Sequence, residues 1–518
     1  MKQFLNKKTF LVATAALGLG IAGCKKSFLD INDNPNAVTE QNVTPELIFP
    51  AGASRAAAIS SSATFLENWM GYFSTAGDYA IDQEETSYNL STTFNSGQWT
   101  GRYDILFDLE QTRKKAVAEG DTVLAGAAII ISSKLWQELV DLYGNIPFTQ
   151  ALNIAQTSTP AYDKDSTVYR LLHANLDQAI SYMHGTARPT YASVIGNIVH
   201  IGLNGSGTAI SQANWIRFAN TLKLRMLIRT SEVATPGINR TAELAKIVAN
   251  GGVLQAGQSV LFNPGYANST GKQTPFYAQY GFTPTNTDGN AIARANKYTV
   301  DTLSAKNDAR LARLYRGAGV TSPTQTGGSV VGTRYGQATG NPFGNVSSKM
   351  GMGTTGTTAA TDMWLFTSVE SLFLQAEAIQ RGWLTGTPAT AYSTAVIESF
   401  RWLGVPGPVL STSPADSTAL AYIAANPYIN PTSLAYQKYY AMNSIDPIEA
   451  YCDYRRLGVP ANSASFLSAN PSRHAGSKLP NRLLYPQEEY SLNFDNVNAQ
   501  GDINKDNIFT TAKIFWQP

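Results

Sequence analysis

Residues 123–148 read VLAGAAIIISSKLWQELVDLYGNIPF, and no other stretch indicates the fold more strongly. Apolar side chains recur three and four positions apart, at Ile131, Leu135, Leu139 and Leu142. This spacing places them on one face of an α-helix, and Gly144 is the kind of residue at which helices end. The stretch therefore predicts a long helix over 123–143 with a wide apolar face to bury.

Four further segments share this helical periodicity, and they cover residues 166–183, 214–229, 367–382 and 392–403. Thr367 and Glu370 have the spacing of a capping box, which satisfies backbone groups at a helix start. Helices joined by short turns pack as antiparallel pairs. We therefore predict a mostly α-helical fold built from tetratricopeptide-like helix pairs, without a regular repeat length.

Long stretches without periodicity separate the helices. Residues 317–356 contain eleven glycines, and Arg334 and Lys349 are their only charged residues. Irregular segments of this length are uncommon inside a compact domain and usually have a function. The helical scaffold should therefore carry large irregular loop insertions.

The N-terminus has the plan of an exported lipoprotein. Basic residues precede a short apolar run over 10–22, and Ile21-Ala22-Gly23 lead directly into Cys24. The apolar run is too short for a stable membrane-spanning helix, which needs about 20 residues. We expect a lipoprotein signal peptide over 1–23, lipidation of Cys24, a tether over 24–45 and a single domain over 46–518.

Charge and cysteine content narrow the possible partners. The 518 residues carry a net charge of +2, with 39 basic and 37 acidic side chains. A nucleic-acid-binding protein usually has a clear excess of basic residues, so we do not expect nucleic acid as a partner. After lipidation of Cys24 only Cys452 remains, so no disulfide can form within the chain. Packing of the core must therefore stabilise the fold.

Motifs for catalysis and for metal binding are weak. The chain has four histidines and neither a G-x-S-x-G nor an H-E-x-x-H motif. Asp82, Glu84 and Glu85 could supply one carboxylate of a glycosidase pair, but the sequence offers no partner across a cleft. Asp502 to Asp506 begins like a calcium loop without the glycine and glutamate that an EF-hand requires. We predict no catalytic residue, no cofactor and no metal site.

Four tripeptides resemble an O-glycosylation acceptor pattern of Bacteroidota. Because Asp commonly caps the first turn of a helix, capping is the simpler interpretation, and both can hold for one residue. The tripeptides begin at Asp121, Asp165, Asp301 and Asp416.

Aromatic residues in polar, glycine-rich sequence are the best indication of a binding site. Such rings offer flat apolar platforms for the faces of sugars or for peptide side chains. The alternative is that they anchor the loops to the scaffold. Our stacking candidates are Tyr79, Tyr88, Trp99, Tyr277 and Tyr280.

A series of short motifs resembles the SusD/RagB family, most closely its SusD-like nutrient-binding lipoproteins. The order and spacing of the motifs carry the resemblance across nearly the whole mature chain. Two departures are Ala309, where the family commonly has proline, and Tyr451, where it commonly has tryptophan. The motifs are FLDIN (28–32), LVDLYGNIPF (139–148), WIRFANTLKLR (215–225), NDARL (307–311), SVESLFLQAEA (368–378), EAYCDYRRLG (449–458), RLLYP (482–486) and KIFW (513–516).

The resemblance implies a surface-exposed lipoprotein of the outer membrane, with a SusC-like TonB-dependent transporter as its partner. In such pairs the lipoprotein acts as a hinged lid that delivers oligosaccharide or peptide into the barrel. A tethered lid raises the effective concentration of ligand above the barrel, so that weak binding suffices.

We therefore expect a non-catalytic lid that captures oligosaccharides. The alternatives are a peptide-capturing lid like RagB and a surface glycoside hydrolase. Under the first hypothesis, Trp99→Ala should weaken ligand binding and leave the melting temperature nearly unchanged. A large loss of stability would instead place Trp99 in the core.

Overall fold

The structure is a computed structural model that describes residues 43–59, 62–203, 206–233, 237–322, 325, 328–405, 416–470 and 478–518. Pro45 to Pro518 form one compact unit. Cys24, the predicted signal peptide and most of the predicted tether lie outside the described residues.

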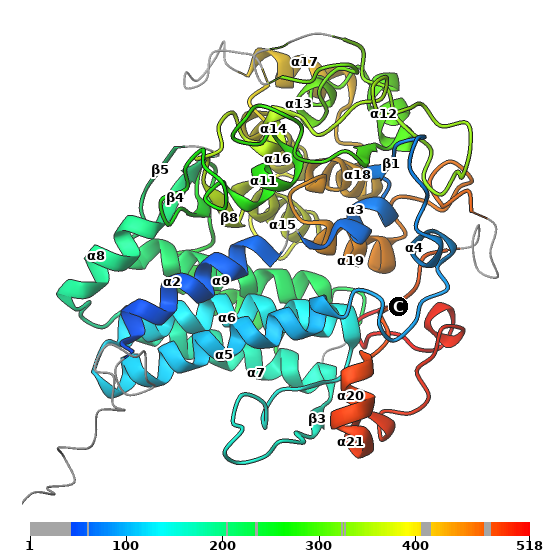
Figure 1. The fold of residues 1–518 in the computed structure, drawn as a ribbon. Helices are drawn as coiled ribbons and strands as arrows, with labels where there is room; N and C mark the ends of the chain where they lie inside the picture. Colours follow the sequence, from blue (N-terminus) through cyan, green and yellow to red (C-terminus); the bar gives the residue numbers. More distant parts are fainter. Residues whose placement is uncertain are drawn as a thin grey trace, which may run out of the picture. The chain divides into compact units, whose positions relative to one another are not determined.

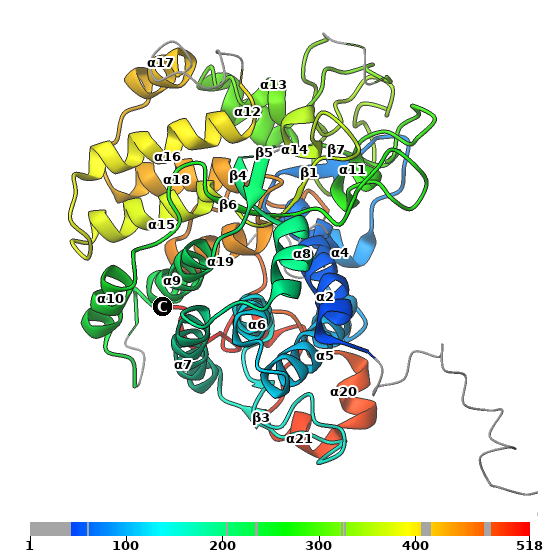
Figure 2. The ribbon, with the colours of Figure 1, turned by 90° about the vertical axis from the view of Figure 1, so that its left-hand side faces the viewer.

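Packed helices form one side of this unit, and each of them contacts a neighbour in the group (Figure 1). Figure 2 shows α6, α7 and α9 nearly end-on, side by side. The predicted helices over 123–143, 166–183 and 214–229 are all present. The group comprises α2 (Pro45–Ile59), α5 (Gly97–Ala118), α6 (Thr122–Tyr143), α7 (Asp165–Met183), α9 (Gln212–Arg229) and α10 (Arg240–Ala249).

Helix α6 lies at the centre of this group and is buried almost all round. By length and composition it could cross a membrane, but 94% of its most apolar window is buried inside the protein. Its interior polar residues are paired: Lys134 contacts Glu138, and Arg102 Nε lies 3.0 Å from a Glu138 oxygen. Burial raises the pKa of Glu138, but the nearby charges of Lys134 and Arg102 outweigh it and lower the pKa to about 2. Helix α6 is therefore the core helix of a globular unit.

A second group of helices packs beside α9. Helices α15 and α16 form the pair that the sequence predicts, α18 packs next to α15, and α19 packs against α18. Gly382, with a φ of +71°, follows α15 as expected. The group comprises α15 (Ser368–Gln380), α16 (Pro388–Trp402), α17 (Ser417–Ala425), α18 (Pro431–Met442) and α19 (Pro447–Leu457).

Small antiparallel sheets join these helices to the loops. The largest sheet has the strand order β5-β4-β6-β8, and β8 leads directly into α15. The others are the pairs β1-β7 and β2-β3. The strands are β1 (Phe73–Thr75), β2 (Ile146–Pro147), β3 (Tyr162–Asp163), β4 (Val199–Leu203), β5 (Ser206–Ala209), β6 (Ser259–Phe262), β7 (Ala293–Ala295) and β8 (Met363–Phe366).

Short helices punctuate the remaining chain. They are α3 (Thr64–Trp69), α4 (Gln83–Ser87), α8 (Pro189–Ile198), α11 (Pro275–Tyr280), α12 (Lys297–Ala305), α13 (Leu311–Leu314), α14 (Met352–Thr355), α20 (Gln487–Leu492), α21 (Phe494–Asn498) and the 3-10 turn η3 (Asn507–Phe509).

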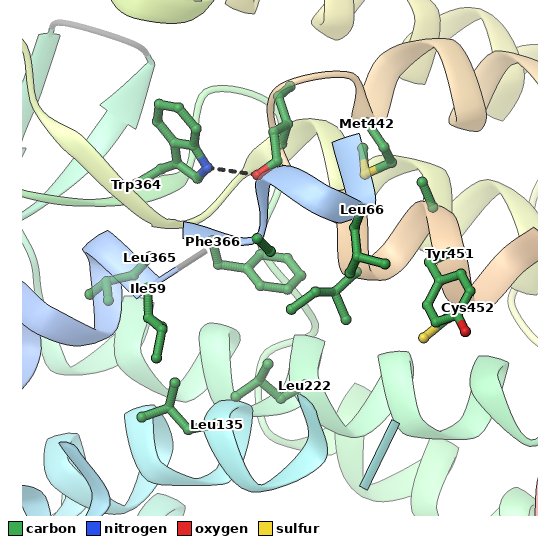
Figure 3. Close-up of a cluster of buried hydrophobic side chains, with 14 of the residues drawn as sticks. Ile59, Leu66, Leu135, Leu222, Trp364, Leu365, Phe366, Met442, Tyr451 and Cys452 are labelled. Atoms are coloured by element: carbon green, nitrogen blue, oxygen red, sulfur yellow. Dashed lines mark hydrogen bonds between the residues drawn. The ribbon is translucent and has the colours of Figure 1, made fainter. Parts of the chain in front are cut away.

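The hydrophobic core extends across both helix groups (Figure 3). Leu135 of α6 and Leu222 of α9 lie on one side of it, and Phe366 of β8 lies near them. Trp364 is buried and donates from Nε1 to the Ile445 carbonyl oxygen at 2.9 Å. Strand β8 thereby connects the two helix groups through the core.

Buried ion pairs connect α9, α15 and α19, the helices that carry three of the family-like motifs. Arg225 Nε of α9 lies 3.0 Å from Glu449 Oε2 and 3.2 Å from Glu370 Oε1. Arg456 Nη2 of α19 lies 2.7 Å from Glu377 Oε2 of α15. The charged positions of these motifs therefore hold helices together and identify no ligand site.

Two expectations about helix starts need correction. Thr367 Oγ1 accepts from the Glu370 backbone at 3.2 Å, but the Glu370 carboxylate pairs with Arg225, so only half of the capping box forms. Among the four Asp-Ser/Thr tripeptides, only Asp121 caps a helix through its side chain, accepting from Leu124 N at 3.0 Å. Asp165 accepts from Phe515 N and from Ser166 N in the first turn of α7, and Asp301 and Asp416 pair with Lys297 and Arg401.

Candidate functional site

Most of the aromatic stacking candidates lie in the core. Tyr88, Trp99, Tyr277 and Tyr280 are buried, whereas Tyr79 is exposed. Burial leaves these four rings little surface for stacking on a ligand, so the structure does not support them as stacking residues. Tyr88, Trp99 and Tyr280 pack in the main core, the alternative that the sequence also allowed, and Tyr277 packs in a small separate cluster.

Trp99 belongs to the first turn of α5 and not to a loop. Its ring centroid lies 5.0 Å from those of Tyr103 and Tyr143 and 5.9 Å from that of Tyr485. Tyr103 is one turn away in the same helix, but Tyr143 and Tyr485 come from distant segments, so the neighbouring sequence shows only part of this cluster.

Tyr88 and Tyr280 also have internal hydrogen-bond partners. The Tyr88 hydroxyl accepts from Ser468 N at 2.9 Å, and the Tyr280 hydroxyl lies 2.6 Å from Thr64 Oγ1. Burial raises the pKa of both phenols, so both hydroxyls stay protonated. Buried tyrosines with satisfied hydroxyls are core residues.

Three loops meet around Tyr79 and form what we call the three-loop surface, residues 76–79, 290–292 and 341–347. Ala76 N donates to the Ile292 carbonyl oxygen at 3.0 Å, and Gly77 N donates to the Pro342 carbonyl oxygen at 2.9 Å. Figure 2 shows β1, β7 and the neighbouring loops on the side of the unit away from α15, α16 and α18. The exposed large apolar side chains of these loops are Tyr79 (39%), Ile292 (49%), Phe343 (59%) and Val346 (52%).

Polar contacts fix the three loops against one another. Gly344 N donates to Asp78 Oδ1 at 2.9 Å, and the buried Arg294 donates to the Gly344 carbonyl oxygen and to Ser347 Oγ at 3.2 and 3.0 Å. A Cβ atom on Gly77 would lie 2.0 Å from the Asn341 carbonyl oxygen, so only glycine permits this approach. The exposed rings therefore stand on a preformed base.

A charged cluster lies beside this surface. Asp288 contacts both Arg316 and Lys349, and the Arg316 guanidinium lies 4.3 Å from the centre of the Phe282 ring. Phe282 packs with the candidate Tyr277 in a small separate hydrophobic cluster. Burial lowers the pKa of Lys349. Asp288 thus balances two largely buried positive charges, and the rings of Phe282 and Tyr277 beside them are buried as well.

Sequence reasoning identified only Tyr79 of the exposed residues on this surface. Phe343 is the one aromatic residue beside Asn341, Pro342 and Gly344, in the glycine-rich segment predicted to be functional. The sequence therefore contained a pattern from which Phe343 could have been chosen as a candidate. Ile292 and Val346 are isolated aliphatic residues in polar sequence, and nothing local distinguishes them from residues that pack inward.

The three acidic residues weighed for glycosidase chemistry have structural partners. Asp82 caps α4 by accepting from Glu85 N at 3.0 Å, and Glu84 accepts from Ser91 N. Glu85 accepts from Asn68 Nδ2 at 2.7 Å and from the Tyr335 hydroxyl at 3.1 Å. These contacts give each carboxylate a role in holding the loop.

No group of three or more His, Cys, Asp or Glu side chains suited to a metal ion occurs within the described part of the chain. In the segment weighed as a calcium loop, Asn504 Oδ1 accepts from the backbone of Asp506 and of Asn507, each at 3.0 Å. These bonds close the turn without an ion.

A family model described as starch-binding and associating with the outer membrane matches residues 35–486. The chain therefore belongs to the SusD-like family, and the mostly α-helical SusD-like fold expected from its motifs is confirmed. Membership supports a nutrient-binding role in association with the outer membrane, in a family of binding proteins. The comparison with curated protein sequences yields no match.

Solved structures with the same fold include a chitin-binding SusD homologue from Flavobacterium johnsoniae, which is 20% identical with a TM-score of 0.65 over 92% of this chain and 96% of that one. A SusD/RagB family protein from Bacteroides thetaiotaomicron is 21% identical, with a TM-score of 0.68 over 92% and 99% of the two chains. A SusD homologue from Bacteroides ovatus is 20% identical, with a TM-score of 0.67 over 87% and 94%. At these identities the similarity establishes the fold.

Proposed function

We propose that the three-loop surface binds an oligosaccharide and that the protein is a non-catalytic, nutrient-capturing lipoprotein. The observation that carries the proposal is the exposure of Tyr79 and Phe343 on loops held rigidly together. Aromatic faces stack on the apolar faces of sugars, and a preformed base reduces the ordering that binding would otherwise require. The starch- and chitin-binding descriptions of the family and of one structural relative support a sugar as the ligand class.

The test is calorimetric titration with maltohexaose and chitohexaose, together with a mixed pool of oligopeptides. Phe343→Ala and Tyr79→Ala should weaken binding of the sugar that binds, with little change in melting temperature, because both rings are exposed. Phe494→Ala is the matched control, since Phe494 is 61% exposed on α21 and lies outside the surface. Binding of peptides alone would favour the peptide-capturing alternative.

We also propose that Cys24 carries lipid chains that anchor the protein to the outer membrane, exposed at the cell surface. About 0.8 kcal/mol per buried CH₂ makes two or more acyl chains a stable anchor. Cys24→Ser should abolish palmitate labelling and release the protein from the membrane fraction. Retention of the variant in that fraction would contradict the proposal.

In the same proposal, a SusC-like TonB-dependent transporter is the partner, and this protein delivers sugar to it as a hinged lid. Family membership is the support for this step. Co-purification of the full chain from its native membrane should recover a TonB-dependent barrel. Hydrolysis products released by the purified protein from a bound oligosaccharide would instead favour the glycoside hydrolase alternative.

A further inference from the structure

A second cavity suited to a sugar lies on the helical scaffold, between α16, α18, the connection from α17 to α18 and the end of α12. We call it the tyrosine groove, and its volume is about 330 Å³. That lies at the lower end of the roughly 300–1,000 Å³ range of ligand sites. Six lining residues matter here: Lys306, Tyr392, Asn426, Tyr436, Gln437 and Tyr440.

Two tyrosines on successive turns of α18 provide apolar walls. Tyr436 and Tyr440 are four residues apart and therefore lie on one helix face. Their ring centroids are 6.1 Å apart, and their planes differ by 36°. Tyr436 is half-buried, and Tyr440 is 3% exposed. Tyr436 therefore presents part of its ring to the groove, whereas the ring of Tyr440 is enclosed.

Most polar groups of the groove are already engaged, which fixes its shape. The Tyr392 hydroxyl donates to the Asn426 carbonyl oxygen at 2.6 Å. Gln437 accepts from Arg310 Nη2 and donates to the Tyr422 hydroxyl, each at 2.8 Å. The Tyr436 hydroxyl accepts from Ala461 N at 3.3 Å. These bonds hold the aromatic walls in place without a ligand.

Two polar groups of the groove remain available. Neither the Tyr440 hydroxyl nor the Lys306 ammonium has a hydrogen bond or an ion pair with any residue that the structure describes. The Tyr440 oxygen is not fully enclosed by the described residues, and it therefore opens on the cavity that Tyr440 lines. Burial raises the pKa of Tyr440, so its hydroxyl is both donor and acceptor.

We propose that the tyrosine groove is a second sugar-binding subsite, which holds one or two sugar units of an oligosaccharide against the half-buried ring of Tyr436. The Tyr440 hydroxyl and Lys306 would bond to sugar hydroxyls. The proposal rests on the proposed carbohydrate function, but it concerns a surface made of different residues.

Other cavities among the described residues fit a ligand less well. The cavity between α15, α18 and α19 has a volume of only about 100 Å³, and its charged residues Glu377, Lys438 and Asp453 already pair with one another or with Arg456. The open depression beside Phe107 and Ile154 has its charges paired as Arg55 and Asp108. Neither combines facing aromatic rings with free donors.

Hydrogen–deuterium exchange of the full chain in detergent, with maltohexaose and with chitohexaose as probes, tests the groove. One of these sugars should slow exchange in peptides that cover 426–440. Tyr440→Phe and Lys306→Gln should each raise the sugar concentration that gives half-maximal protection about two- to tenfold. This is the change expected for the loss of one hydrogen bond. Both substitutions keep the size of the side chain similar, so the melting temperature should not change.

Phe343→Ala serves as the control that separates the two sites, because it alters the three-loop surface and should leave protection of 426–440 in place. If sugar protects 341–347 but never 426–440, the groove proposal fails and the proposed function stands. If neither region is protected by either sugar, both proposals fail for these ligands. Protection of 426–440 that is unchanged in Tyr440→Phe and Lys306→Gln would also overturn the groove.

Discussion

At the scale of single residues, exposure separates rings that can meet a ligand from rings that hold the fold. Trp99 and Phe343 are both aromatic residues in polar, turn-rich sequence, yet Trp99 is enclosed by tyrosines and Phe343 is 59% exposed. Polar neighbours in sequence do not exclude a core position, because the packing partners come from elsewhere in the chain.

Trp99→Ala should therefore destabilise the protein, which reverses the expectation from sequence. Removing a buried tryptophan costs about 3–5 kcal/mol through lost contacts and the cavity left behind. Urea unfolding should show this loss, while calorimetry should find sugar affinity close to that of the unaltered protein. Weaker sugar binding with unchanged stability would show that Trp99 contacts the ligand.

Glu85 should make stability depend on pH. Burial, and to a lesser degree the charge of Asp82, raises the pKa of Glu85 from 4.5 to about 7 against the hydrogen bond from Asn68. Between these values the folded protein binds a proton that the unfolded chain does not, so stability falls as pH rises from about 4.5 to about 7. The loss is at most about 3 kcal/mol, at about 1.4 kcal/mol per pH unit.

Glu85→Gln should flatten that part of the stability profile, measured by urea unfolding at several pH values. Glu84→Gln is the neighbouring control and should keep the original slope. A Glu85→Gln protein that retains the full slope would show that another group is responsible.

At the scale of helices, the family motifs place charged residues where helices meet. Arg456 of α19 pairs with Glu377 of α15 and with Asp453 one turn away in its own helix, all of them buried. Such pairs fix which helices pack together, and burial makes the loss of one partner expensive.

Arg456→Met should cost about 3 kcal/mol of unfolding free energy, because it removes one partner from each of two buried carboxylates, which keep Arg381 and Lys438. Lys297→Met is the control: it breaks the exposed pair with Asp301 in α12, and such pairs contribute at most about 1 kcal/mol. Chemical denaturation measures both variants. Equal losses in the two would show that burial does not set the cost.

At the scale of the whole compact unit, the three-loop surface exists because segments more than 250 residues apart lie in contact. Gly77 and Gly344 stand at this junction, where Asp78 accepts from Gly344 N. The surface is therefore a property of the assembled structure and of no single loop.

Gly77→Ala should separate the loops, because the new Cβ would meet the Asn341 carbonyl oxygen at 2.0 Å. Crowding of this kind costs about 1–3 kcal/mol, and sugar binding should weaken because Tyr79 and Phe343 lose their common base. Gly97→Ala is the control, since a Cβ there would meet nothing within 4 Å. Thermal unfolding and sugar titration together check the result, and unaltered sugar affinity in Gly77→Ala would show that the junction does not position the site.

The sequence by itself determined five of the helices and the family. The apolar period over 123–143 and Gly144 placed α6 with one added residue at its start, because helix formation depends on neighbours three and four positions away. The order and spacing of the short motifs predicted a SusD-like protein, and three of these motifs contain the charges that join α9, α15 and α19.

Only the tertiary structure decided which residues are exposed. It buried Tyr88, Trp99, Tyr277 and Tyr280, left Tyr79 at the surface, and joined the loop of Tyr79 to the distant loop of Phe343. It also added the sheet β5-β4-β6-β8, whose short strands carry no signal of their own. Exposure depends on contacts between distant segments, and a local pattern of residues cannot specify those contacts.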